Sequence, residues 1–426
     1  MRSKLLRNFP RAGYIIFLPK SSISTSASAP NSALFWLRKE TLLDEKRAPL
    51  APQDAKMLIK KGAKVVVEEC SQRIFTTESY AKAGCEIERA GSWINAPYYA
   101  YILGLKEIPD AIFDQEYAIK NYHAYFAHAY KGQAHAKTIL DRFIKGGGIN
   151  LDLEYLVDDK GKRVAAFGFY AGCATTALAI NIWCQKQLGK EPPFKIPSYY
   201  ESKAELISDL KKLLAQVEKF PNILVIGKNG RSGRGALELA QELKIEASGW
   251  GRDETRNASV TGIDEIANYD IFLNCVFNDK VINPFVTKET LQQKDRKLSV
   301  IGDVTCDFGA KNMIKIAGYE TSTSFENPTW QYQDLDIMAI DHTPTLLPLE
   351  SSTEFSKALV KYLSVLPPNP ADILKNHNQD PLIKVWLRAI EKFYEVSSKI
   401  GLIKPSSVFK PKRAESVEKK EQNEKL

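Results

Sequence analysis

The sequence predicts an α/β fold in which parallel sheets are covered by helices. Its 426 residues are enough for two or three domains with cores of their own. Apolar residues make up 44% of the chain and charged residues 26%, a balance that excludes a mostly disordered, collagenous or coiled-coil protein. Short apolar runs alternate with amphipathic stretches of helical period, which is the order that parallel sheets require.

The net charge of +8 is concentrated at the two ends of the chain. Residues 1–30 hold five Lys or Arg and no acid, and residues 405–426 hold six Lys or Arg against four Glu. The long middle section is therefore almost neutral and has no basic excess with which to neutralise a row of phosphates. We expect no nucleic-acid partner.

The two ends differ from the rest in composition as well. Residues 1–30 combine spaced cations with the serine-rich run Ser21–Ser28, which is typical of a mitochondrial transit peptide. The apolar stretch Tyr14–Leu18 is too short for a secretory signal. The alternative is a disordered extension on a cytoplasmic protein. Residues 405–426 are predicted to form a disordered charged tail.

Metal, disulfide and membrane sites are not expected. The six cysteines are widely spaced and form no C-x-x-C pair, which argues against a zinc site and a disulfide scaffold. Residues 164–184 carry no charge over a length that could cross a bilayer. They include two glycines, adjacent threonines and Asn181, however, which favours a helix buried inside a large domain.

The expected strands and helices alternate along the chain. Strands are predicted at Phe35–Arg38, Ala63–Glu68, Tyr98–Leu103, Ala124–Ala129, Ile149–Leu153, Asn222–Ile226, Ile245–Trp250, Ile271–Val276 and Leu298–Val304. Helices are predicted at Pro52–Lys61, Gly132–Lys145, Val164–Cys184, Glu201–Lys219 and Ala236–Leu243.

A glycine-rich turn joins one of these strands to the next helix. Gly227, Gly230 and Gly233 directly follow the strand Asn222–Ile226. Glycines at such a turn let the backbone approach a pyrophosphate, whose charge the helix N-terminus stabilises. The spacing G-x-x-G-x-x-G differs from the usual G-x-G-x-x-G, so a dinucleotide site and a structural turn both remain open on this motif alone.

Several ionisable residues lie near predicted strand ends in the N-terminal half. Lys106 and Glu107 follow one strand, and His128 lies at the end of another. A lysine in a buried cleft can act as a base because desolvation and neighbouring cations lower its pKa, whereas a surface ion pair is the structural alternative. A core histidine would look the same as a functional one. Arg47 and Arg163, at loop–helix junctions, are ligand cations or ordinary surface charges.

Together these segments resemble the L-lysine-forming saccharopine dehydrogenases over roughly residues 34–400. The resemblance is carried by the runs DEKRAPL (44–50), GLKEIP (104–109), FAHAYK (126–131), RFIKG (142–146), RVAAFGFYAG (163–172) and IDHTPTLLP (340–348). Alanine dehydrogenase and the lysine-ketoglutarate reductase portion of a bifunctional enzyme look like more distant relatives.

The resemblance implies two Rossmann-like, doubly wound domains with the active site in the cleft between them. Residues 31–163 and 344–404 would form the substrate-side, catalytic domain, and residues 164–343 the dinucleotide-binding domain. The implied reaction, the last step of lysine synthesis through α-aminoadipate, is the reversible oxidative cleavage of saccharopine by NAD. Its products are L-lysine and 2-oxoglutarate.

The resemblance also implies roles for residues of this chain. Lys106 and His128 match the acid–base pair, and Glu107 and Glu154 match the carboxylates beside it, which would tune the two pKa values. Arg47, Gln133, Arg163 and Phe167 match substrate-side positions, and Lys131 adds a cation for a substrate carboxylate. Cofactor positions are matched by Gly230, Arg231, Thr255, Val304, Ile340, Asp341, His342 and Thr343, to which the glycine turn adds Gly227 and Gly233.

This chain departs from the family at the end of the second cofactor-domain strand. At that place the family pattern resembles Trp-Asp-x-x-Glu-Thr, and its Asp binds the ribose hydroxyls of the cofactor. This chain has Gly251 at that position, followed by Arg252, a residue that favours a 2′-phosphate. NADP use is therefore predicted beside NAD, although a register shift could bring Asp253 to the ribose.

Two other functions and any oligomeric state stay open at this stage. One is another amino-acid dehydrogenase of the superfamily, such as an alanine dehydrogenase or an NADPH-linked lysine-ketoglutarate reductase. The other is a non-catalytic dinucleotide-binding protein, against which the joint presence of Lys106 and His128 argues.

Overall fold

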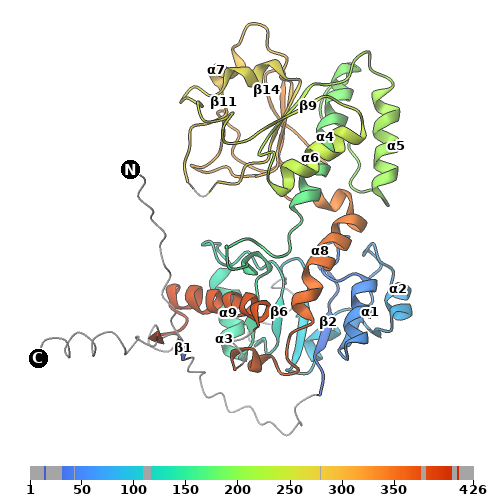
Figure 1. Ribbon diagram of the computed structural model, residues 1–426, viewed down its shortest axis with the longest axis vertical. Helices are drawn as coiled ribbons and strands as arrows, with labels where there is room; N and C mark the ends of the chain where they lie inside the picture. Colours follow the sequence, from blue (N-terminus) through green and yellow to red (C-terminus); the bar gives the residue numbers. More distant parts are fainter. Residues whose placement is uncertain are drawn as a thin grey trace, which may run out of the picture.

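The computed structural model describes residues 31–42, 44–108, 117–278, 280–375 and 380–404, and the short strands β1 (Tyr14–Ile15) and β16 (Lys410–Pro411), which pair antiparallel. The rest of the expected transit peptide and of the expected charged tail lies outside the described residues. Figure 1 shows two α/β units, one above the other, and each contains a six-stranded sheet.

The lower unit in Figure 1 has six parallel strands in the order β4-β3-β2-β5-β6-β7. The first strand of this sheet in sequence, β2, lies in its middle; the chain then runs outward to β4 and continues from β5 on the other side of β2. The strand order therefore reverses between β2 and β5, which is where α/β sheets bind ligands. The strands are β2 (Leu34–Leu37), β3 (Lys64–Glu68), β4 (Glu86–Glu88), β5 (Ala100–Leu103), β6 (Tyr122–Ala124) and β7 (Ile149–Asn150).

Helices from distant parts of the chain cover this lower sheet. The helix α1 packs against β3 and α8, and α9 packs against β7. One hydrophobic core therefore joins residues 34–165 to residues 355–396. The helices are α1 (Pro52–Lys60), α2 (Thr77–Ala83), α3 (Ala136–Gly146), α8 (Pro348–Leu363) and α9 (Pro381–Lys399), with 3-10 turns η1 (Ser92–Asn95), η3 (Leu153–Tyr155) and η6 (Pro370–Leu374).

The upper unit has the strand order β14-β15-β12-β10-β8-β9, and only β14 runs antiparallel to its neighbour. Here the order reverses between β8 and β10. The strands are β8 (Ile223–Ile226), β9 (Ala247–Trp250), β10 (Ile271–Asn274), β12 (Val300–Asp303), β14 (Trp330–Tyr332) and β15 (Leu335–Met338), beside the small parallel pair β11 (Val286–Thr287) and β13 (Ile314–Lys315).

Successive residues of these strands point to opposite faces of the upper sheet. Ile223 and Val225 belong to the core shared with α4, and Leu224 and Ile226 belong to a second core. The first of these cores extends to Leu347, a few residues past the expected boundary at residue 343. The helices are α4 (Gly168–Gln187), α5 (Lys203–Leu214), α6 (Arg231–Glu242) and α7 (Lys288–Leu291), with turns η4 (Asp264–Asn268) and η5 (Thr343–Leu346).

The predicted fold class, two α/β units with parallel sheets, is confirmed. Most of the uncharged segment forms the buried helix α4, which begins at Gly168 and not at Val164 as predicted. Within the described part of the chain no helix has the length and apolar character to span a membrane.

Two predicted elements are wrong in ways that affect the site. The strand expected at 124–129 ends at Ala124, so His128 lies in a loop with a φ of 48°. The backbone N–H of Ala127 donates to the side chain of Asp152 (3.3 Å) and not to a neighbouring strand. The helix expected from Ala236 begins at Arg231, so part of the glycine-rich turn is already helical.

The helices α4 and α6 cross in close contact through two glycines. A Cβ at Gly172 would lie 1.8 Å from the carbonyl oxygen of Ser232, and a Cβ at Gly235 would lie 2.0 Å from that of Phe169. Both obstacles are backbone atoms, so neither can turn aside as a flexible side chain would. The crossing therefore requires glycine at both positions.

The Gly172→Ala variant should accordingly lower the free energy of unfolding by about 1–3 kcal/mol, the usual cost of overpacking a core. Urea denaturation measures this loss. The control is Gln187→Ala, at an exposed position of the same helix, which should change the unfolding free energy by no more than about 0.5 kcal/mol. If both variants unfold at the wild-type midpoint, the two helices do not cross this closely.

Candidate active site

The predicted site residues come from both units and meet between them. Asp341, which follows β15 in the upper unit, has a lowered pKa. The largest cause is the hydrogen bond from His342, and the charges of Lys106 and His128 in the lower unit lower the pKa further. His342 also reaches across to Asp44, with 3.4 Å between Nε2 and Oδ2. The carboxyl ends of both sheets therefore supply charged groups to one place.

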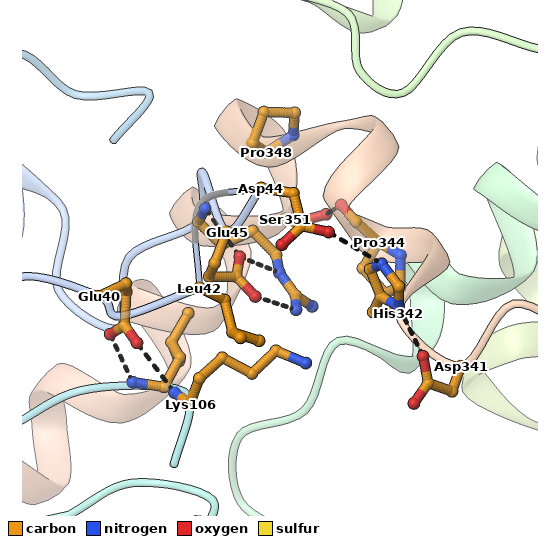
Figure 2. Close-up of polar contacts among 12 residues, drawn as sticks. Glu40, Leu42, Asp44, Glu45, Lys106, Asp341, His342, Pro344, Pro348 and Ser351 are labelled. Atoms are coloured by element: carbon orange, nitrogen blue, oxygen red, sulfur yellow. Dashed lines mark hydrogen bonds and ion pairs between the residues drawn. The ribbon is translucent and has the colours of Figure 1, made fainter. Parts of the chain in front are cut away.

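Lys106 lies three residues after β5, where the strand order of the lower sheet reverses. Its backbone N–H donates to Glu40 (2.9 Å). Figure 2 shows its side chain extending away from Glu40 toward the side on which Asp341 and His342 lie. The end of β5, which the sequence predicts, thus places the amine of Lys106 between the two units.

His128 is paired with Glu107 and not with Lys106. Its Nδ1 lies 2.8 Å from Oε1 of Glu107, and both side chains are about half exposed. The other oxygen of Glu107 is 4.0 Å from Nε2 of His135. The left-handed backbone of His128 is uncommon for a residue other than glycine, and here it belongs to a loop residue that meets a carboxylate.

Glu154 gathers two of the predicted substrate cations. Its Oε1 accepts from Lys131 (2.8 Å) and from Arg163 (2.6 Å), and Gln133 accepts from the backbone N–H of Lys131 (2.8 Å). Burial, the largest single influence, raises the pKa of Glu154, but the hydrogen bond from Lys131 and the charge of Arg163 outweigh it. The pKa is therefore lowered, and Glu154 stays ionised beside both cations.

Arg47 is buried in a two-pronged ion pair that the sequence did not predict. Its Nε and Nη2 donate to the two oxygens of Glu45 at 2.8 and 2.6 Å, and the side chains are only 6% and 1% exposed. The guanidinium lies 4.5 Å from the ring centre of Phe167, which stacks on Phe355 at 4.3 Å. Burial alone would raise the pKa of Glu45, but Arg47 keeps it lowered.

The glycine turn has the geometry that a dinucleotide phosphate needs. Gly227 adopts a φ of 104°, and a Cβ at Gly233 would lie 2.1 Å from its carbonyl oxygen. Gly230 precedes α6, and among the described residues no side chain caps the first turn of this helix. Backbone N–H groups at that end are therefore free to bind a phosphate. Arg231 donates to the backbone carbonyl of Arg163, which brings this helix end to a residue predicted to lie on the substrate side.

The remaining cofactor candidates lie around the ends of the upper strands. Thr255 donates to the carbonyl of Gly251 (2.9 Å), Val304 donates from its backbone to Asn274 (3.0 Å), and Thr343 lies 3.3 Å from the hydroxyl of Thr175. Ile340 is buried and Arg252 is exposed. Among the described residues no group of His, Cys, Asp and Glu gathers as a metal site would.

Sequence reasoning missed four acidic residues of this region: Glu40, Asp44, Glu45 and Asp152. Burial raises the pKa of Asp152 to about 6, although its carboxylate accepts from the backbone N–H groups of Glu154 and Ala127. Three of the four lie within residues 38–47, where the dense run of charged residues in an otherwise apolar context was the available signal.

Comparison with known proteins shows the fold and the family of the chain. Residues 36–174 match the family model described as "Alanine dehydrogenase/PNT, N-terminal domain". Two solved structures share the fold: an L-alanine dehydrogenase (TM-score 0.59, 14% identity, covering 86% of this chain and 100% of that one) and a transhydrogenase from Sinorhizobium meliloti (TM-score 0.56, 16% identity, 83% and 97%).

Sequence similarity is much higher to curated proteins named saccharopine dehydrogenase [NAD(+), L-lysine-forming]. The protein from Emericella nidulans is 41% identical over 345 residues, which cover 77% of this chain and 90% of that protein. The protein from Schizosaccharomyces pombe is 37% identical over 375 residues, covering 84% and 97%. The chain belongs to the saccharopine dehydrogenase family. The family resemblance predicted from the sequence is thereby confirmed, and the matched stretch of these saccharopine dehydrogenases spans both units.

Proposed function

We propose that the chain is an NAD-dependent saccharopine dehydrogenase, which cleaves saccharopine oxidatively and reversibly to L-lysine and 2-oxoglutarate. The observation that carries this proposal is that His342 of the upper unit reaches Asp44 of the lower unit (3.4 Å), on the side toward which the Lys106 side chain extends (Figure 2), in a chain of this family. The amine of Lys106 and the imidazole of His128 are the kinds of group that oxidation and hydrolysis of a secondary amine need.

The substrate-side cations suit the three carboxylates of saccharopine. Arg47, Arg163 and Lys131 belong to the unit that also carries Lys106, and each is held by a glutamate. Lys131 and Arg163 are partly exposed and can bind a substrate carboxylate directly, whereas Arg47 is 6% exposed and would have to leave Glu45 to do the same. Gln133 and Phe167 complete the binding surface through an amide and an aromatic face.

The chemistry divides between the two proposed acid–base residues. Lys106, in its neutral form, accepts the proton of the secondary amine of saccharopine. Bound NAD supplies the hydride acceptor. His128, oriented by Glu107 through Nδ1, then activates the water that adds to the imine carbon, and the resulting carbinolamine collapses to L-lysine and 2-oxoglutarate. Glu154, fixed as an anion, keeps Lys131 and Arg163 in place.

An absorbance assay at the nicotinamide band tests the proposal. Saccharopine with NAD should produce NADH, and L-lysine with 2-oxoglutarate should consume it. L-alanine with NAD is the matched alternative, because an alanine dehydrogenase would oxidise it. Turnover of alanine without turnover of saccharopine would reject the proposal, and so would binding of NADH without turnover of either substrate.

The cofactor preference depends, in this proposal, on Glu254. The N–H of Gly251 donates to one carboxylate oxygen of Glu254 (2.7 Å), and Lys228 pairs with the other (2.5 Å). A Cβ built on Gly251 lies 3.5 Å from that first oxygen, so this carboxylate is beside the place that an aspartate at 251 would fill. Glu254 can then accept from the ribose hydroxyls, while Lys228 and Arg252 offer cations to a 2′-phosphate.

The wild-type protein should bind NADH more tightly than NADPH, with measurable binding of both. Glu254→Gln should shift the ratio of the two dissociation constants toward NADPH by roughly tenfold, because a carboxylate that repels the phosphate is lost. The double variant Gly251→Asp, Arg252→Ile should shift it the other way. Fluorescence titration with each reduced cofactor gives both ratios. An unchanged ratio in Glu254→Gln would assign the preference to another group.

The localisation proposed here is mitochondrial, on the composition of residues 1–30. Fusion of these residues to a fluorescent reporter tests it. A reporter that colocalises with mitochondria supports the proposal, and a diffuse cytosolic signal rejects it.

A further inference from the structure

Two buried, oppositely charged side chains lie on either side of the Lys106 backbone. Arg38 and Glu40 follow β2 and are 1% and 2% exposed. Their closest charged atoms, Nη1 of Arg38 and Oε2 of Glu40, are 3.6 Å apart. Burying two charges costs free energy unless hydrogen bonds satisfy them, so their partners indicate what the pair is for.

Those partners are the backbone groups around Lys106. The two oxygens of Glu40 accept separately from the N–H of Leu105 (2.7 Å) and the N–H of Lys106 (2.9 Å), as Figure 2 shows. The guanidinium of Arg38 donates to the carbonyl oxygen of Lys106. Both backbone polar groups of one residue are therefore bound by one buried ion pair.

The guanidinium of Arg38 fits here because residue 104 is a glycine. A Cβ at Gly104 would lie 2.4 Å from Nε of Arg38, so the guanidinium packs directly on the glycine that follows β5. The contact links β2 to β5, the two strands between which the sheet order reverses. The direction in which the Lys106 side chain leaves the backbone is thus set by the strand on the other side of the reversal.

We propose that Arg38 and Glu40 are positioning residues for the amine of Lys106, an inference that rests on the role proposed for Lys106 above. Neither side chain is exposed enough to bind saccharopine, so both act through the lysine. Their loss should slow the proton transfer and leave substrate binding largely as it is. A misplacement of about 1 Å in a reacting group can cost about 10²-fold in rate.

The test uses two variants that disturb the ion pair from different sides. In Glu40→Gln, the amide oxygen can accept from one N–H, but the amide nitrogen faces the other N–H, and Arg38 loses its counter-charge. In Gly104→Ala, the added methyl displaces the guanidinium of Arg38. Each should lower kcat by about 10- to 100-fold with a KM that changes much less. Glu86→Gln, at an exposed position of β4, is the control and should match the wild type.

A double variant separates positioning from a general structural role. Added to Lys106→Met, Glu40→Gln should lower kcat no further, because the group it positions is already gone. In the single variant the limb of the kcat/KM pH profile that Lys106 contributes should shift. The inference would be overturned if the reductions in kcat from Glu40→Gln and Lys106→Met multiplied fully in the double variant. An unshifted kcat/KM pH profile in Glu40→Gln would overturn it too. If Glu40→Gln fails to fold, Gly104→Ala combined with Lys106→Met makes the same comparison.

The Lys106 variant and the variants of the buried ion pair give different results in the two cases. If Lys106→Met keeps wild-type turnover, the role proposed for Lys106 is wrong, and the positioning inference falls with it. If Lys106→Met is impaired while Glu40→Gln and Gly104→Ala turn over saccharopine normally, the positioning inference alone is wrong.

Discussion

Replacing Lys106 with methionine should lower the turnover of saccharopine by about 10²- to 10⁴-fold, the usual effect of losing an acid–base group. Methionine keeps much of the length and apolar stem of lysine but cannot accept a proton. The cations proposed to hold the substrate carboxylates are separate residues, so saccharopine should still bind. Steady-state kinetics measures the first effect, and calorimetric titration with saccharopine measures the second.

The matched control for this prediction is Lys137→Met. Lys137 is an exposed lysine of α3 in the same unit, and it has no part in the proposed site. Its replacement should leave kcat near the wild-type value. Equal turnover by both methionine variants would show that the amine of Lys106 takes no part in the reaction. A loss of saccharopine binding in Lys106→Met would instead make Lys106 a binding residue.

Breaking the Arg47–Glu45 pair should have a large effect on stability. Glu45→Gln leaves the Arg47 guanidinium buried without its counter-charge, and breaking a buried pair in this way costs about 3–5 kcal/mol. Chemical denaturation at neutral pH measures the loss. The control is Glu395→Gln, an exposed residue whose ion pairs with Lys399 and Lys392 lie at the surface, and it should cost no more than about 1 kcal/mol.

The effect of Glu45→Gln should depend on pH in a defined direction. Arg47 lowers the pKa of Glu45 in the folded protein below its ordinary value of 4.5. The stabilisation from this carboxylate is therefore fully present above pH 4.5 and is lost as the pH falls through the folded value. The difference between wild type and variant should stay constant near neutrality and narrow only in acid. A difference that narrows as the pH rises would contradict the ion pair.

The position of Lys106 could be predicted from the sequence because it depends on a local signal. The apolar run before it forms β5, which is buried on both faces, and a parallel strand buried in this way is a continuous apolar segment. His128 follows a similar run, yet its strand ends four residues earlier. There the side chain of Asp152 takes the N–H of Ala127, a contact across 25 residues that no local pattern contains.

Side-chain partners were the least predictable part of the site. Arg47 was singled out as a cation, but its pairing with Glu45 depends on both residues being buried together, which is set by α8 and by Phe167 from far along the chain. The sequence marks Gly251 as a departure from the family pattern. Neither Arg252 nor Asp253 contacts it through any hydrogen bond that the structure describes, whereas Glu254 folds back onto its N–H.

The shared core of the lower unit has a consequence for the order in which the chain can fold during its synthesis. Phe143 packs against Phe393, so the first unit lacks part of its core until residues 355–396 have left the ribosome. The cores of the second unit end at Leu347 and are complete before that point. The upper unit can therefore fold first, although most of the lower unit precedes it in the sequence. Until residues 355–396 are available, strands β2–β7 keep part of their apolar surface exposed, a state that favours chaperone binding.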